Sequence, residues 1–232
     1  MPTNGHRTMD SSRHLRTAKQ IGTGLCFVVF PLVFVFAFSV HPNLTAPRFL
    51  GPFDLIARAH RAGLLHFAHA LVTLATALLV VVALHFMNLL EREGRPWWGF
   101  IGGALAILGS LALAADKGAL CLSMSALDSL SDTEFENMMP GLLAIFSKRG
   151  WLFLIWGVLL LPVGFGIQAI GLLRTGALPR WQSVLFLIGV LFIGTPDGAE
   201  LVNLVASLLM ALAFVPYGVR LLRTSGDQEA GA

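Results

Sequence analysis

Long apolar runs, separated by short polar connections, occupy most of the chain. Six of them are nearly free of charged residues, at positions 21–40, 62–90, 97–115, 151–173, 181–194 and 199–222. A helix needs roughly 20 mostly apolar residues, rising 1.5 Å each, to cross the hydrocarbon core of a bilayer. The pattern predicts a single transmembrane domain over 21–223 with about six spans. The run at 181–194 is the shortest, and its length also allows a re-entrant segment that does not cross fully.

Composition supports the same architecture. Hydrophobic residues make up 56% of the chain and charged residues 12%, whereas soluble domains average about 25% charged residues. The predicted fold class is therefore all-α, a polytopic membrane helix bundle. The net charge of +3 comes from basic residues scattered at the ends of the apolar runs. They form no contiguous basic stripe, which argues against nucleic acid as a partner.

The distribution of Lys and Arg predicts the orientation. If the N-terminus is cytoplasmic, ten Lys and Arg residues lie on the cytoplasmic side and six on the other. Cytoplasmic loops carry an excess of these residues, so the chain is predicted to be N-in and C-in. Residues 1–20 are then a basic cytoplasmic tail and residues 224–232 a flexible one.

Both long outer loops have amphipathic segments. Residues 53–61 alternate apolar and charged positions at helical spacing, which is typical of a helix lying in the membrane interface. Ser131 and Glu134 have the spacing of a capping box, which predicts a helix start. The apolar side chains that follow, from Phe135 to Leu143, are predicted to rest on lipid or on a partner subunit.

Residue types inside the spans predict how these pack. Small residues let helix backbones approach closely, so we expect close helix contacts at Gly22, Gly24, Gly102, Gly103, Gly164 and Gly166. The first and fifth spans are rich in Phe, Val and Leu and lack charged groups. They are predicted to face lipid, pigment or a partner.

Ionisable residues are predicted to gather at the outer boundary. Counting roughly 20 residues from the inner end of each span brings side chains of the second, third and sixth spans to one plane. This candidate polar cluster consists of His66, His69, Asp116, Lys117, Asp197, Glu200 and Asn203.

Helical spacing suggests which members of the cluster act together. His66 and His69 are three residues apart and share a helix face, as do Asp197 and Glu200. Two imidazoles and a carboxylate suit zinc, iron or copper, so His66, His69 and Glu200 form a candidate divalent-metal site. The alternative is a structural cluster, in which Asp197 stabilises a helix start and Lys117 reaches toward the interface.

The positions of the histidines disfavour a haem held by this chain alone. A haem between two spans takes axial histidines from facing helices, but the span histidines all lie on one predicted helix. His66 and His85 are ~28 Å apart along it at 1.5 Å per residue. His85 is predicted to be a packed or interfacial residue.

The closing segments resemble a family. The inner turn Leu178-Pro179-Arg180-Trp181 and the segment from Val215 to Arg223, which begins Val-Pro-Tyr-Gly, resemble uncharacterised bacterial multi-pass integral membrane proteins with six helices. The resemblance covers the last third of the chain. It implies placement in a bacterial inner membrane, and it brings no activity or site residues with it.

Three functions remain open from the sequence. The first is a non-catalytic subunit or scaffold of a membrane complex, formed as a homo-oligomer or with partner membrane subunits, since no nucleotide-binding, hydrolase or metalloprotease motif is present. The second is a small transporter or a proton- or metal-coupled membrane protein that uses the polar cluster. The third is a membrane enzyme acting on a lipid or a quinone.

Overall fold

The computed structural model describes residues 4–42, 44–45, 50–193 and 199–230. The described part of the chain forms eight α-helices, one 3-10 helix and no strand, which confirms the all-α prediction. In chain order the elements are α1 (Asn4–Ser39), α2 (Pro52–Ala59), α3 (Gly63–Arg92), α4 (Pro96–Leu127), α5 (Asp132–Phe146), η1 (Gly150–Leu159), α6 (Leu160–Thr175), α7 (Arg180–Phe192) and α8 (Glu200–Ala230).

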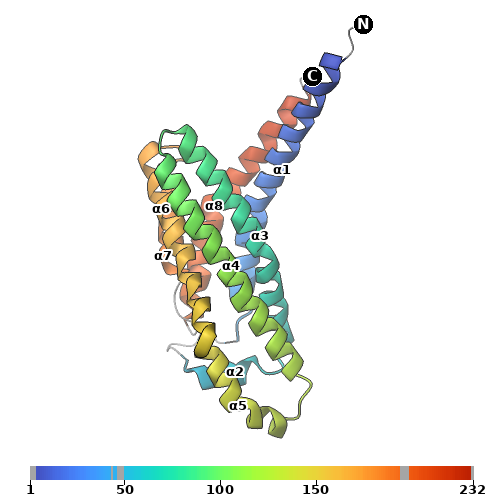
Figure 1. Ribbon diagram of the computed structural model, residues 1–232, viewed down its shortest axis with the longest axis vertical. Coiled ribbons are helices and arrows are strands. Elements are labelled where there is room, and N and C mark those ends of the chain that lie inside the picture. The colour runs from blue at the N-terminus through green and yellow to red at the C-terminus, as the bar shows by residue number, and fades with distance from the viewer. Residues whose placement is uncertain (1–3, 43, 46–49, 194–198, 231–232) are drawn as a thin grey trace.

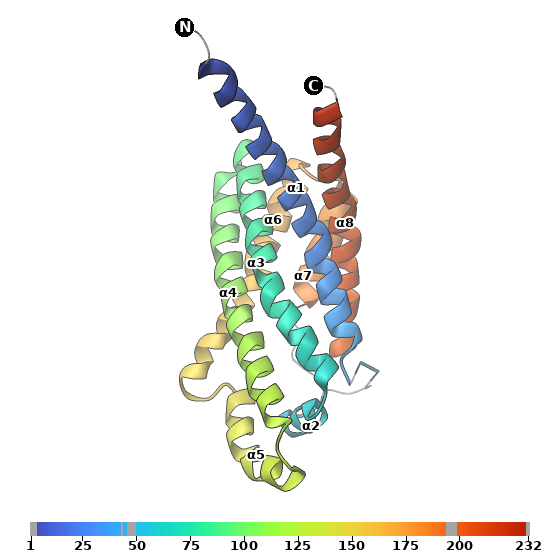
Figure 2. The same cartoon turned by 90° about the vertical axis from the view of Figure 1, so that its right-hand side faces the viewer.

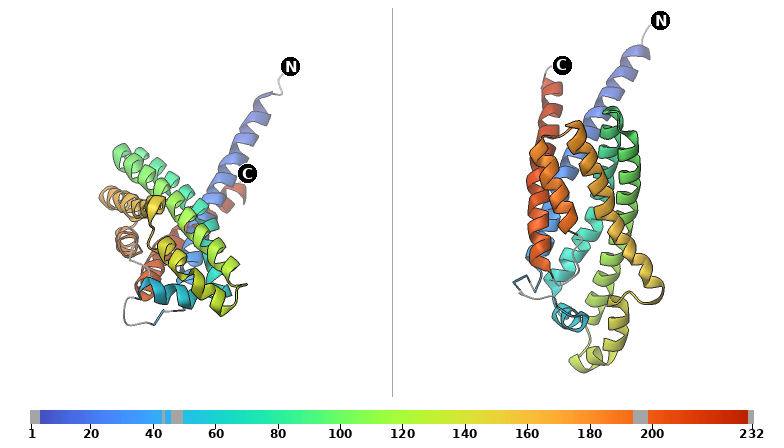
Figure 3. Two further views of the ribbon diagram at one scale, coloured as in Figure 1. Left: turned by 60° about the horizontal axis from the view of Figure 1, so that its bottom comes forward. Right: turned by 90° about the vertical axis from the view of Figure 1, so that its left-hand side faces the viewer.

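Six helices of the described part of the chain pack side by side in a closed ring. Going round it, α1 contacts α3, α3 contacts α4, and α4 contacts α6; α6 then contacts α7, α7 contacts α8, and α8 returns to α1. Both termini lie at one end of the elongated bundle, and α2 and α5 lie at the other (Figures 1 and 2). We call the latter the cap end, and Figure 3 shows it tilted toward the viewer in its left panel.

Among the described residues, five stretches of helix are long and apolar enough to cross a membrane, so the chain is a multi-pass membrane protein by helix length and composition. They are Arg13–Ser39, Gly63–Arg92, Pro96–Leu127, Gly150–Thr175 and Glu200–Thr224. The remaining apolar helix, α7, has 13 residues and is therefore only ~20 Å long. The count of six spans and the N-in orientation stay predictions.

Several helices extend past their apolar runs. α4 continues beyond Ala115 to Leu127, α1 already begins at Asn4, and α8 runs on to Ala230. Hydropathy reports where a helix stops being apolar, whereas its backbone hydrogen bonds continue until a breaker or a cap intervenes. Asp116 and Lys117 consequently lie within a continuous helix rather than at its end.

The predicted fourth span is divided into two kinds of helix. Its first part, η1, is a 3-10 helix of ten residues, and α6 begins at Leu160. Pro162 lies in the first turn of α6, and proline has no N–H to donate to the carbonyl of Val158. The α-helical hydrogen-bond pattern therefore cannot run unbroken through this point.

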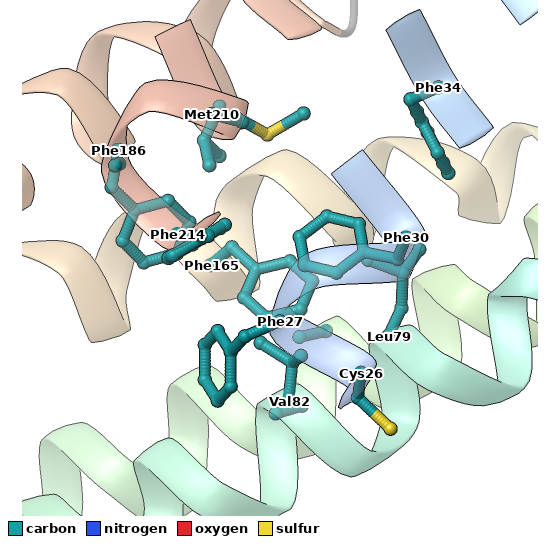
Figure 4. Close-up of a cluster of buried hydrophobic side chains, with 14 of the residues drawn as sticks. Cys26, Phe27, Phe30, Phe34, Leu79, Val82, Phe165, Phe186, Met210 and Phe214 are labelled. Carbon is teal, nitrogen blue, oxygen red and sulfur yellow. The ribbon is translucent and has the colours of Figure 1, made fainter. Parts of the chain in front are cut away.

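Aromatic rings fill the centre of the ring of helices. Phe27 of α1 makes edge-on contacts with Phe86 of α3 and Phe214 of α8, with ring centroids 5.3 and 5.4 Å apart. The ring centroid of Phe186 of α7 lies 4.6 Å from that of Phe214, and Figure 4 shows Phe27, Phe186 and Phe214 on their different helices. Each such pair contributes about 0.5–1.5 kcal/mol beyond its buried area. The first and fifth predicted spans thus place their phenylalanines in the core, so the prediction that they face lipid, pigment or a partner is wrong for those residues.

Close contacts with a neighbouring helix occur at four of the six expected glycines. A Cβ added to Gly102 would lie 2.8 Å from the carbonyl oxygen of Gly164, and a Cβ added to Gly164 would lie 2.2 Å from the backbone nitrogen of Ala106. Gly24 and Gly103 also have neighbours within 3.0 Å. Gly22 and Gly166 have none within 4 Å, so the expectation fails there. The closest approach is at Gly109, where an added Cβ would lie 2.1 Å from the nitrogen of Leu161.

The two amphipathic loop segments pack on each other. Ser131 caps α5 through the predicted capping box, accepting from the backbone N–H of Glu134 and donating its own N–H to that side chain. Phe135 and Leu142 of α5 are buried in one cluster with Ile56 of α2. The same cluster includes Leu65 of α3 and Met124 of α4. Phe135 and Leu142 therefore rest on this chain, and the expectation of lipid or a partner subunit is wrong for these two residues, whereas Met138 of the same segment is exposed.

Candidate functional site: a polar cavity at the cap end

A cavity of about 270 Å³ lies toward the cap end of the bundle. Its apolar lining comes from six elements, with Phe34 on α1, Val72 on α3, Leu113 on α4, Phe146 on α5, Val158 on η1 and Leu161 on α6. Its polar lining consists of His41, His69, Asp116, Lys117, Lys148, Glu200 and Asn203. Five of the seven residues of the candidate polar cluster, from three different helices, thus border one cavity.

Glu200 is the most deeply buried acidic residue of this lining, with 2% of its surface exposed. It lies in the first turn of α8, where the positive end of the helix dipole favours a carboxylate. Its Oε1 atom lies 3.7 Å from Nδ1 of His41, just beyond the end of α1. Asn203, one turn further along α8, is also buried and lines the same cavity.

Asp116 lies between two lysines. Its Oδ2 atom is 3.5 Å from Nζ of Lys117, and its Oδ1 atom is 3.5 Å from Nζ of Lys148. Asp116 is 5% exposed, so this carboxylate is shielded from water and compensated by two cations. The chain has only three lysines, and two of them are at this carboxylate.

His69 and His66 occupy different surroundings although they share a helix face. His69 lines the large cavity, and its ring centroid lies 6.2 Å from that of His41. His66 does not line it, and borders with His69 a smaller cavity of about 40 Å³. Its Nε2 atom lies 3.0 Å from Oδ2 of Asp128, at the end of α4.

Asp128 gathers a second polar cluster at the cap. Its Oδ1 atom accepts a 2.7 Å hydrogen bond from the backbone N–H of Arg61 and lies 3.7 Å from Nδ1 of His60. The His60 ring stacks on Phe135 at 3.8 Å between centroids. These contacts attach α5 and the start of α3 to the end of α4. His66 therefore belongs to the joint that holds the cap in place.

The three residues of the candidate metal site, His66, His69 and Glu200, do not all border the same cavity. Among the residues that the structure describes, no three or more His, Cys, Asp or Glu side chains are grouped so that they could hold a metal ion. His66 faces Asp128, while His69 and Glu200 border the large cavity. Asp197 lies outside the described residues. The metal assignment stays a prediction.

Sequence reasoning missed three residues of the cavity. His41 lies two residues after the end of α1, Lys148 precedes η1, and Trp156 lies within η1. Counting from the inner end of the fourth predicted span would have placed Lys148 near the same boundary as Asp116. His41 had no comparable signal, because the depth argument considered three spans and omitted the first.

His85 is a packed residue, as predicted. Its Nε2 atom lies 2.8 Å from the hydroxyl oxygen of Tyr217, and its ring packs against Phe27 and Phe86. This contact joins α3 to α8 away from the cap. Interhelical hydrogen bonds of this kind contribute about 0.6 kcal/mol on average in membranes.

Comparison with known proteins adds no assignment to this geometry. No family model, no curated protein and no solved structure matches the chain. The cavity and its lining residues are therefore the basis for a functional proposal.

Proposed function

We propose that the protein binds an amphipathic small molecule in the cavity at the cap end. The observation that carries this proposal is the lining itself, in which phenylalanine and aliphatic side chains adjoin a set of ionisable ones around about 270 Å³. Ligand sites are concave and mostly apolar, with a few polar groups that fix the orientation of the ligand. The volume suits a small molecule or a single acyl chain.

Polar and apolar residues of the lining would contact different parts of the ligand. Lys117 and Lys148 can donate to a polar or anionic group of the ligand, since both already point at the Asp116 carboxylate. The aromatic and aliphatic residues further from the cap would contact its apolar part. Ionisable groups at membrane depth are functional candidates, and this cavity holds two buried acids, Asp116 and Glu200.

Placement in the cell follows from the proposed topology. With the termini cytoplasmic, as the excess of Lys and Arg at that end favours, the cap and the cavity belong to the outer half of the membrane. The membrane is proposed to be a bacterial inner membrane, on the resemblance of the closing segments.

The scaffold hypothesis comes second to ligand binding. It depended on two amphipathic outer segments available for docking to a partner subunit. Those segments bury Ile56, Phe135 and Leu142 against each other instead. A proton-coupled transporter fits the same cavity, and the specific observation that favours it is the buried Glu200 carboxylate beside His41.

Photolabelling tests the binding proposal. The full chain would be reconstituted in phosphatidylcholine vesicles and labelled with a diazirine-bearing palmitic acid, and the labelled residues would be mapped by mass spectrometry. We expect label at cavity residues such as Phe34 and Leu113, and we expect an excess of unlabelled palmitate to remove it. Label confined to exposed residues and unaffected by competition would refute the proposal.

Two variants in which an alanine is replaced by phenylalanine, one inside the cavity and one outside it, provide the control. Ala37→Phe places a ring into the cavity, because Ala37 lines it, whereas Ala77→Phe places the same ring on an exposed face of α3. We expect the first variant to lose roughly tenfold in affinity, which corresponds to about 1.4 kcal/mol, and the second to label as the native chain does. Imposing a pH gradient across the vesicles then distinguishes proton-coupled transport from simple binding.

A further inference from the structure

The cavity wall formed by η1 is weakly packed. No residue of η1 is buried, and Trp151, Phe153, Leu154 and Trp156 are each more than half exposed. Yet Trp156, Val158 and Leu159 line the cavity from this element. A single layer of apolar side chains therefore stands between the cavity and the exposed surface of the bundle, which faces lipid in a membrane protein of this design.

The helix type of η1 also sets it apart. Runs of 3-10 helix longer than three or four residues are uncommon, and a stretch of this kind often marks a hinge, whereas η1 has ten residues. It packs on α4 and is continuous with α6. At the start of η1, Lys148 and Gly150 both have positive φ angles, of 51° and 62°. This element thus lies between a sharp turn and the Pro162 break.

A latch holds the turn side of η1 against α4. Nζ of Lys148 lies 3.5 Å from Oδ1 of Asp116 on α4 and 5.2 Å from the ring centroid of Trp156 within η1. Lys148 therefore connects the two walls of the cavity by one side chain. A ligand group that binds Lys148 competes with Asp116 for it and weakens this connection.

We propose that η1 is a lateral gate through which the ligand enters the cavity from the lipid leaflet that surrounds it. The inference rests on the proposed binding function and names its substrate class, a membrane-resident lipid with a polar end that Lys148 can contact. Lys148, Asp116 and Trp156 form the latch of this gate. Lipid-soluble molecules reach the cavity through the apolar side of the bundle, without passing through water at the cap.

A disulfide across the gate tests the proposal. A Cβ at Gly157 in η1 would lie 3.4 Å from the Cβ of Ala112 in α4, close to the separation that a disulfide requires. The variant is Gly157→Cys with Ala112→Cys, in a chain whose free cysteines Cys26 and Cys121 are replaced by alanine. The vesicles are oxidised before the diazirine-bearing palmitic acid is added. We expect cavity labelling to fall at least tenfold and to return after reduction.

The order of addition separates the gate from the binding site. When the probe is added before oxidation, the closed gate should retain it against an excess of unlabelled palmitate. Equal labelling and equal exchange in the oxidised and reduced forms would overturn the gate while leaving binding intact. Loss of cavity label in the reduced form as well would overturn the binding function itself. Each single-cysteine variant, treated with the same oxidant, should label as the reduced double variant does.

A second variant keeps the test decisive if the disulfide forms poorly. Lys148→Met removes the charge that holds Asp116 and retains an apolar side chain beside Trp156. We expect the cavity to be labelled several times faster after the probe is added than in the native chain, because the latch is lost, whereas the loss of a ligand contact alone would not speed entry. Labelling no faster than in the native chain would contradict the latch.

Discussion

Nδ1 of His41 lies 3.7 Å from Oε1 of Glu200, so the segment after α1 meets the first turn of α8 inside the cavity lining. His41 is 15% exposed at its side chain and Glu200 is 2% exposed. Two chain segments about 160 residues apart thus place a histidine and a carboxylate together, away from bulk water. Their separation is longer than a direct hydrogen bond but within the distance of an ion pair.

Replacing His41 by alanine is expected to destabilise the bundle in detergent. The buried carboxylate loses a neighbour that compensates it, and such losses cost about 1–3 kcal/mol. Combining His41→Ala with Glu200→Gln should recover part of this loss, because the amide needs no counter-charge. Thermal unfolding of the four proteins of this cycle gives the coupling energy, and additive effects would show that the two side chains act independently. Glu200→Gln alone should lower the melting temperature more than Asp197→Asn.

Gly109 is expected to tolerate no side chain. An added Cβ would lie 2.1 Å from the nitrogen and 2.5 Å from the Cα of Leu161, both of them backbone atoms. Gly109→Ala must therefore separate α4 from the η1–α6 junction, at a cost of about 1–3 kcal/mol or more. Gly166→Ala is the matched control on α6, where nothing lies within 4 Å, and removing a helix glycine there should stabilise by up to about 1 kcal/mol. Melting curves in detergent that rank the two variants the other way would contradict this packing.

The fold could be predicted from the sequence to the level of an all-α membrane bundle, because a long apolar run without charges has few other structures. Which face of a span points inward could not. Phe27 and Phe186 lie on runs that are apolar all round, so periodicity carries no direction there. The 3-10 helix was also hidden, since hydropathy is the same for both kinds of helix and Pro162 predicts only a kink.

The candidate site, too, could be predicted from the sequence only in part. Counting residues along each span identified Asp116, Glu200 and Asn203 because strongly polar side chains in apolar runs are rare, and the structure places all three in one lining. It could not separate His66 from His69. Their different surroundings are set by the rotation of α3 and by the cap end, where His66 contacts Asp128 outside the large cavity. Contacts between segments distant in sequence decide which neighbours each histidine has, and these contacts cannot be predicted from the residue pattern of one sequence.

The cap is expected to unfold locally when its aromatic centre is removed. Phe135 is 4% exposed, stacks on His60 and packs beside Ile56. Phe135→Ala should cost the cap about 3–5 kcal/mol, and hydrogen exchange should accelerate in α2 and α5 while the membrane core stays protected. Met138→Ala is the control on the same helix, since Met138 is 47% exposed. Equal exchange in the two variants would show that the cap does not depend on this cluster.

The capping box predicts a dependence of α5 on pH. Hydrogen bonds from the Ser131 hydroxyl and backbone N–H lower the pKa of Glu134 below its ordinary value. A carboxyl whose pKa is lowered by folding stabilises the folded state above its unfolded pKa, about 4.3, and this stabilisation is lost as the pH falls through the folded pKa. Hydrogen exchange in the first turn of α5 should therefore accelerate relative to its last turn when the pH is lowered from 6 to 3. In Glu134→Gln, where the amide can still accept these hydrogen bonds at every pH, this relative acceleration should disappear; if it persists, another group is responsible for it.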